Sequence, residues 1–111
     1  MWIHLCMYSI QKTAVFDKWL TKLKDKRAKA KILFRIQRIE DTGNFGDCEP
    51  VGHGIRELRI HYAKGYRVYF KEYKGTIVLL LNGGTKSSQQ KDIDKAKQMW
   101  EYYKAEWDNE N

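Results

Sequence analysis

The chain has 111 residues, of which 42% are hydrophobic and 14% aromatic, with 21 Lys and Arg against 14 Asp and Glu. This composition is typical of one packed domain and argues against intrinsic disorder, while no apolar run approaches the ~18–20 residues of a membrane span. Two cysteines cannot build a disulfide scaffold, and the net charge of +7 favours an anionic partner. We expect a single cytoplasmic domain over residues 1–111. Met7 is an alternative start, which would leave residues 1–6 as an upstream extension.

The N-terminal part of the chain predicts a short strand followed by two helices. The strand is expected over residues 8–11. Thr13 can cap a helix that runs to about residue 24, because apolar side chains recur there at spacings of three and four. The same spacing predicts a second helix over residues 26–41. Gly43 is placed to end this helix in a left-handed conformation.

Positive charge is densest over these two helices. Residues 18–38 carry nine basic side chains and the single acid Asp25. Such a surface attracts phosphates or an acidic protein. A solvated helix face would look the same in the sequence, because Lys and Arg favour helices.

Residues 43–54 are expected to form an irregular loop, since they hold Pro50 and four of the eight glycines. After this loop the apolar period changes to two. That change predicts strands over residues 55–62 and 65–73, joined by a three-residue hairpin turn.

Matching of the apolar faces sets the expected register of this hairpin, with Tyr62 opposite Tyr66. Leu58 and Ile60 would then face Phe70 and Val68 in the core. The opposite face would carry a polar set exposed to solvent. Its members are Glu57, Arg59, His61, Arg67, Tyr69 and Lys71.

The C-terminal part predicts one more strand and one more helix. The apolar run at residues 76–81 is typical of a strand buried on both faces. Ser87 and Gln90 resemble a capping box that would start the last helix. The order of strand, two helices, three strands and helix predicts an α+β fold. We expect the helices to pack on one face of a small, mainly antiparallel sheet.

The polar hairpin face is the main candidate for function. Arginine, histidine and tyrosine suit phosphate contact and base stacking, and strands hold such groups rigidly. A solvated sheet face with cross-strand charge pairs is the plain alternative. An ion pair with Lys71 or Arg59 would explain Glu57 as well as a catalytic role does. The histidines and cysteines lack metal-ligand spacing, so no metal and no cofactor are expected.

Two segments carry a resemblance to a known family. GNFGDCEPVGHGIRELRIHYAKGYRVYF and IVLLLNGGTKSSQQKDIDKAK resemble the RelE/ParE toxin superfamily, and within it the HigB-like, phage Gp49-like addiction module killer group. The likeness covers nearly everything from Met7 to Ala105. It implies a RelE-like fold and a type II toxin that cleaves messenger RNA as an endoribonuclease, usually on the ribosome. It also implies a cognate helix-turn-helix antitoxin that silences the toxin in a hetero-oligomeric complex.

The implied reaction needs no metal. A ribose 2′-hydroxyl attacks the adjacent phosphate, which requires a base, positive charge for the transition state and an acid for the leaving oxygen. The resemblance makes Arg67 the candidate for charge stabilisation, with Arg59 assisting and Glu57 or His61 as the base. The candidate RNA and phosphate contacts are Lys71, Tyr69 and Lys86.

The chain departs from part of the superfamily after its last strand. Several relatives carry a His-Tyr pair or another essential side chain there, whereas this chain reads GGTKSSQ. The residues therefore do not identify the general acid. The ParE branch has the same fold but poisons DNA gyrase without cutting RNA, and it is the main alternative. A nucleic-acid-binding module without catalysis is the third.

Overall fold

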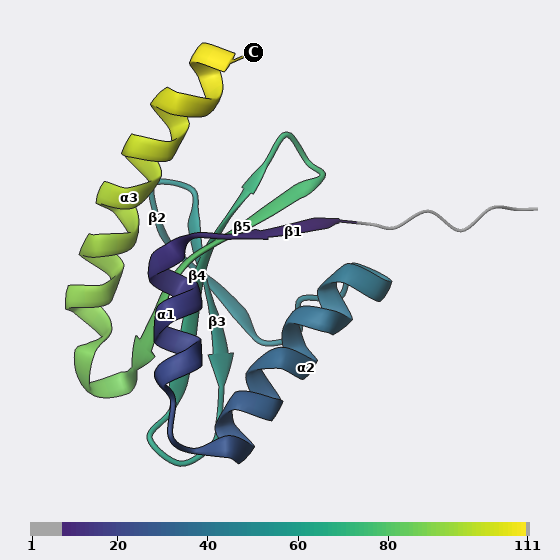
Figure 1. Cartoon of the computed structure of the whole chain (residues 1–111), viewed down its shortest axis with the longest axis vertical. Coiled ribbons are helices and arrows are strands. Elements are labelled where there is room, and N and C mark those ends of the chain that lie inside the picture. Colours follow the sequence, from purple (N-terminus) through teal and green to yellow (C-terminus); the bar gives the residue numbers. More distant parts are fainter. Residues whose placement is uncertain (1–7, 111) are drawn as a thin grey trace, which may run out of the picture.

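The computed structural model describes residues 8–110 (Figure 1). The expectation about residues 1–6 lies outside this range. The elements are β1 (Ser9–Lys12), α1 (Ala14–Lys22), α2 (Lys26–Thr42), β2 (Cys48–Gly52), β3 (Ile55–Ile60), β4 (Tyr66–Tyr73), β5 (Ile77–Thr85), the short 3₁₀ helix η1 (Lys86–Ser88) and α3 (Gln89–Glu110). None of the described helices is both long enough and apolar enough to cross a membrane.

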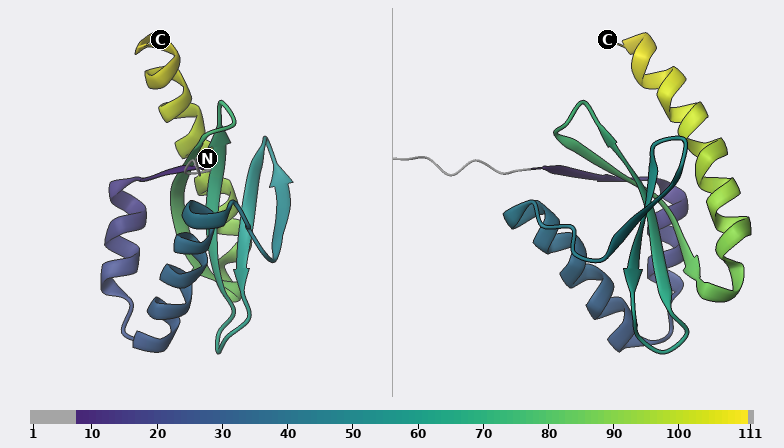
Figure 2. Two further views of the ribbon diagram at one scale, coloured as in Figure 1. Left: turned by 90° about the vertical axis from the view of Figure 1, so that its right-hand side faces the viewer. Right: turned by 180° about the vertical axis from the view of Figure 1, so that it is seen from behind.

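The strands form one twisted sheet in the order β1-β5-β4-β3-β2, and only β1 and β5 pair in parallel. α1 and α2 cover one face, and α3 covers the other (Figure 2). The α+β class and the mainly antiparallel sheet are confirmed. The expectation that all helices share one face is wrong.

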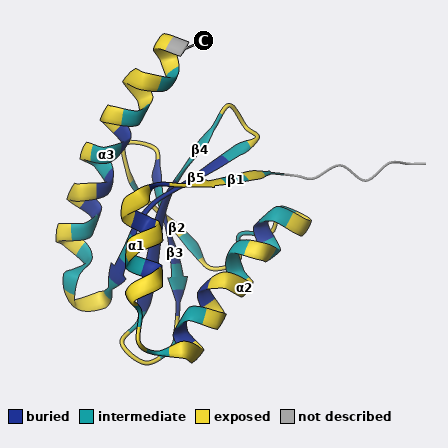
Figure 3. Ribbon diagram, viewed as in Figure 1, coloured by how far each residue is buried: buried dark blue, intermediate teal, exposed yellow. Residues whose placement is uncertain are grey.

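The helices and the sheet form three layers, because the central strands are apolar on both sides. Val68 and Leu80 pack with the core under α1 and α2. Tyr69, Leu79 and Leu81 pack against α3 instead. Figure 3 shows the buried central strands between exposed outer helix surfaces. A two-faced apolar sheet needs cover on both sides, which α3 supplies.

The predicted helix signals work as expected. Thr13 caps α1, since its hydroxyl accepts from the Phe16 N–H at 3.0 Å and donates to the Leu81 carbonyl at 2.6 Å. Asp25 caps α2. Gly43 ends α2 with a φ of 75°, a left-handed conformation that favours glycine.

The hairpin register differs from the prediction by two residues. Ile60 pairs with Tyr66 and Arg59 with Arg67, while Glu57 pairs with Tyr69. The turn is therefore longer than three residues. Because side chains alternate along a strand, a two-residue shift leaves each residue on its predicted face.

Two further local expectations are wrong. The segment predicted as a loop contains β2, an edge strand on which Pro50 is tolerated because an edge strand leaves backbone N–H groups unpaired. The capping box uses Thr85 and Ser88 rather than Ser87 and Gln90, since the Ser88 hydroxyl accepts from the Thr85 N–H at 3.4 Å.

Two adjacent glycines let helices approach β5 from both sides. A β-carbon on Gly83 would lie 2.3 Å from the Trp19 ring of α1. A β-carbon on Gly84 would lie 1.8 Å from the Asp92 carboxylate of α3. Contacts this short do not occur in real structures. Gly83 therefore requires glycine, because the Trp19 ring cannot bend away, whereas a side chain at position 84 would displace the Asp92 carboxylate.

We therefore expect Gly83→Ala to destabilise the fold by about 1–3 kcal/mol, as overpacking does. Urea unfolding of the purified protein measures this loss. Trp19→Ala removes the obstructing ring, so in that background Gly83→Ala should be far less damaging. An equal loss in both backgrounds would contradict the packing argument.

Candidate active site

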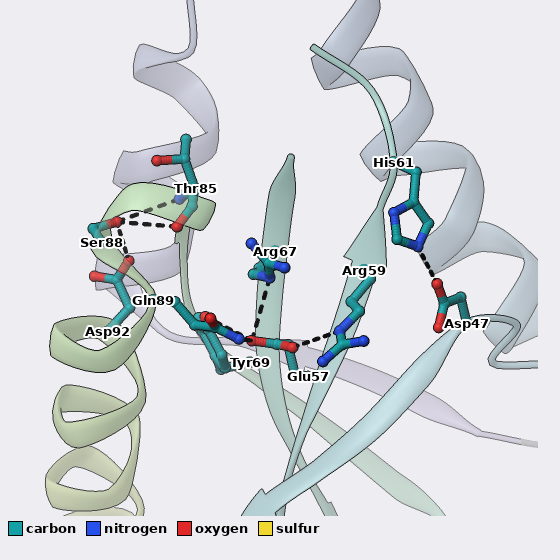
Figure 4. A network of polar contacts seen from close by, with 10 residues as sticks. All are labelled: Asp47, Glu57, Arg59, His61, Arg67, Tyr69, Thr85, Ser88, Gln89 and Asp92. Carbon is teal, nitrogen blue, oxygen red and sulfur yellow. Dashed lines mark hydrogen bonds and ion pairs between the residues drawn. The ribbon is translucent and has the colours of Figure 1, made fainter. Parts of the chain in front are cut away.

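Glu57 lies at the centre of a buried polar network on the sheet face under α3 (Figure 4). Its side chain is 0% exposed. One carboxylate oxygen accepts from Arg59 Nε at 2.8 Å. The other accepts from the Tyr69 hydroxyl at 3.0 Å and from Gln89 Nε2 at 2.8 Å. Arg67 Nε lies 3.4 Å from the same oxygen. The network thus ties β3, β4 and the start of α3 together.

The charge state of Glu57 follows from these contacts. Burial alone would raise the pKa of its carboxyl. The donated hydrogen bonds and the nearby guanidinium charge outweigh burial, so the pKa of Glu57 lies below its ordinary value. Burial, and then the charge of Glu57, raise the pKa of Tyr69, so its hydroxyl stays protonated as a donor. Glu57 is therefore ionised at neutral pH.

Arg67 is held here with spare hydrogen-bonding capacity. The residue is 9% exposed, and among the described residues its buried Nη1 has no acceptor. A β-carbon on Gly65 would lie 3.8 Å from this Nη1 and 3.5 Å from Lys86 Cβ. Lys86 is exposed, so Arg67 and Lys86 come together at the β3–β4 turn. Two arginines against one carboxylate leave net positive charge, which suits an anion.

His61 lies outside this network, beyond the end of β3. Its side chain is 71% exposed, and Nε2 pairs with the Asp47 carboxylate. Arg35 of α2 supports this corner by donating to the carbonyls of Arg59 at 2.5 Å and Asp47 at 3.0 Å. In Figure 4, Arg59 lies between the His61–Asp47 pair and Arg67.

Lys71 also lies apart from the network. Its Nζ sits 5.5 Å from the centre of the Trp100 ring of α3. It is four residues along β4 from Arg67, which is roughly 13 Å in a strand. Lys71 and Glu57 do not pair across the hairpin, since Lys71 is opposite Ile55.

The expectation that this polar face is open to solvent is wrong. α3 covers Glu57 and Tyr69, both of which are fully buried, and most of Arg67. Tyr69 therefore supports Glu57 and has no free ring face for base stacking. The Arg59 side chain is 33% exposed and the Arg67 side chain 11%, so only part of the predicted face is accessible.

Sequence reasoning missed several members of the site. Gln89 donates to Glu57 from the first turn of α3, and Asp47 pairs with His61. Ser88 donates to the Asp92 carboxylate at 2.5 Å. Gln89 and Ser88 lie in the GGTKSSQ stretch, but their roles have no signal in hydrophobic periodicity. Among the described residues, no three His, Cys, Asp or Glu side chains gather as a metal site.

We expect Glu57→Gln to lower the free energy of unfolding by on the order of 3 kcal/mol near pH 7, because it leaves two arginines without their shared counter-charge. The ionised carboxylate stabilises the fold above the ordinary pKa of 4.5. This contribution disappears as the pH falls through the lower pKa of the folded state. The gap between parent and variant should therefore close in acid.

Urea unfolding at about pH 7 and about pH 3 measures this gap. Glu101→Gln, at an exposed position on α3, is the control with the same charge change. A gap that persists unchanged in acid would show that packing, and not charge, explains the loss.

Comparisons with known proteins place the chain among its relatives. Residues 18–101 match the family described as Phage derived protein Gp49-like (DUF891). An uncharacterized protein of Haemophilus influenzae is 57% identical over 88 residues, covering 79% of this chain and 88% of that protein.

Solved structures share the fold at low sequence identity. A chain of the chromosomal ParDE TA system from P. aeruginosa superposes with a TM-score of 0.56 at 19% identity, over 71% of this chain and 96% of that one. A chain of the toxin–antitoxin complex RelBE2 from Mycobacterium tuberculosis gives 0.51 at 15% identity, over 76% and 97%. The fold thus resembles those of chains from the ParDE and RelBE2 systems, as expected from the RelE/ParE resemblance, and the chain belongs to the phage-derived Gp49-like family.

Proposed function

We propose that this chain is the toxin of a type II toxin–antitoxin system and cleaves messenger RNA on the ribosome in the cytoplasm, without a metal. A cognate helix-turn-helix antitoxin would silence it. The observation that carries the proposal is the buried Arg67, which is ion-paired with Glu57 and whose Nη1 has no hydrogen-bond partner among the described residues. A preorganised guanidinium is what a phosphate transition state requires. The family match and the toxin-like fold support the same conclusion.

The arginines would act on the phosphate, and Glu57 would position them. Arg67 stabilises the charge that develops on the attacked phosphate, and Arg59 assists from the paired position on β3. Glu57 is a poor base, because donors fill both of its oxygens and its pKa is low. Its role is to hold both guanidinium groups in place without cancelling their combined charge.

His61 is the better candidate for the base that takes the 2′-hydroxyl proton. It is exposed, and Asp47 orients its ring through Nε2, which leaves Nδ1 for substrate. A histidine supported by a carboxylate is a recurring general-base arrangement. Lys86, beside Arg67, would bind a neighbouring phosphate. Lys71, further along β4, would contact another part of the RNA.

A ParE-like gyrase poison is the second candidate. It is supported by the fold shared with a chain of the ParDE TA system, just as the fold shared with a chain of RelBE2 supports the first proposal. The two functions leave different products in cells that express the protein without antitoxin. A ribonuclease leaves cleaved transcripts and halted translation, and a gyrase poison leaves DNA breaks. DNA breaks with intact transcripts would refute the ribonuclease proposal.

Arg67→Ala should reduce messenger RNA cleavage in a translating extract by about 10²–10³, by analogy with loss of one oxyanion donor. Because Arg67 is mostly buried, some loss of stability is also expected, and circular dichroism checks that the variant is folded. Arg27→Ala removes the same charge from an exposed position on α2 and is the control. A folded Arg67→Ala protein that cuts at the parent rate would rule out this site.

His61→Ala should lower cleavage by about 10²–10⁴, the range for loss of a general base, with little change in stability because the side chain is exposed. Asp47→Asn should reduce the rate less, since it only removes the orienting charge. Single-turnover cleavage of messenger RNA in the same extract measures both. Parent-like cleavage by His61→Ala would show that His61 is not the base.

A further inference from the structure

A second positively charged feature lies away from Arg67. A groove of about 470 Å³ opens between α1 and α3 over the end of β5. Figure 1 shows these two helices on either side of that strand end. Each helix supplies two exposed lysines four residues apart. Lys18 and Lys22 come from α1, and Lys91 and Lys95 come from α3.

These lysines are not placed for helix stability. Like charges four residues apart on a helix repel each other. Among the described residues, none of the four forms an ion pair within 4.0 Å. Asp92 is the one acidic residue among the described residues that line the groove with the four lysines, so the groove has a net positive charge, which favours an anionic ligand.

The floor of the groove holds a buried acceptor, the side-chain oxygen of Asn82. Asn82 is 2% exposed, and its Nδ2 donates to the Asp92 carbonyl at 3.0 Å. Among the described residues, its buried Oδ1 has no hydrogen-bond donor. A buried carbonyl oxygen in a native structure normally has a partner. A ligand that brings an N–H or O–H group into the groove would satisfy it.

One wall of the groove is aromatic. The half-buried Trp19 ring lies directly on Gly83, where a side chain would collide with it. This close packing holds the indole rigidly at the groove. Rigid aromatic side chains next to positive charge are how proteins bind unpaired bases.

We propose that this groove is a second nucleic-acid site, which binds one or two nucleotides of single-stranded RNA. The lysines contact phosphates, Trp19 stacks on a base, and Asn82 Oδ1 accepts from a base N–H. An acidic peptide fits less well, because its acidic side chains offer no base to stack on the Trp19 ring at the groove. The proposal goes beyond cleavage, since binding here does not require the Arg67 site.

The test uses a labelled oligouridine with 2′-O-methyl groups, which cannot be cleaved by 2′-hydroxyl attack. Lys18→Ala/Lys95→Ala should weaken its binding about tenfold at physiological salt and reduce the salt slope of log K by about 1.4, as expected for two lost phosphate contacts. Lys74→Ala/Lys104→Ala removes the same charge outside the groove and should leave affinity unchanged. Equal affinity of the two double variants would overturn the proposal.

Two further measurements sharpen the result. Binding should change tryptophan fluorescence, and Trp19→Phe should abolish that change; a signal unaffected by Trp19→Phe would exclude stacking there. The binding of polyglutamate is measured in parallel. If Lys18→Ala/Lys95→Ala weakens the binding of polyglutamate but not that of oligouridine, the RNA assignment is overturned in favour of an acidic protein partner. If oligouridine binding depends on the groove lysines but the protein cleaves no messenger RNA, the proposed catalysis is refuted and the groove remains a binding site.

Discussion

The buried carboxylate of Glu57 is the constraint on which the rest of the site depends. A charge removed from water must be surrounded by donors, and here they come from three elements that are distant in the chain: β3, β4 and α3. The requirement fixes the start of α3 over the sheet through Gln89. It also fixes Arg59 and Arg67 side by side, with more positive charge than one carboxylate neutralises.

The end of β5 has a comparable role in packing. Gly83 admits the Trp19 ring on one face, and Gly84 admits Asp92 on the other. Gly84 also pairs with Arg67 across the sheet. The same short segment therefore brings α1 and α3 together around the lysine groove and places α3 over the arginines. Packing and charge in this part of the molecule have a common structural origin.

Prediction from sequence was most accurate where the physical signal is local. Thr13 and Gly43 mark helix ends through their own side-chain and backbone chemistry. Glu57, Arg59, Arg67 and Tyr69 share one face although the register was wrong by two residues, because alternation has a period of two. β2 was missed because its glycines and Pro50 carry loop signals that edge pairing overrides.

The sequence by itself determined the fold class, the strand faces and the residue types that meet beside Arg67. Only the tertiary structure decided which of those faces is covered. Alternation shows that Glu57 and Tyr69 share a side, but it does not show that α3 lies on that side. Burial depends on contacts between residues far apart in the chain. Those contacts turned a predicted open surface into a buried carboxylate that holds two arginines.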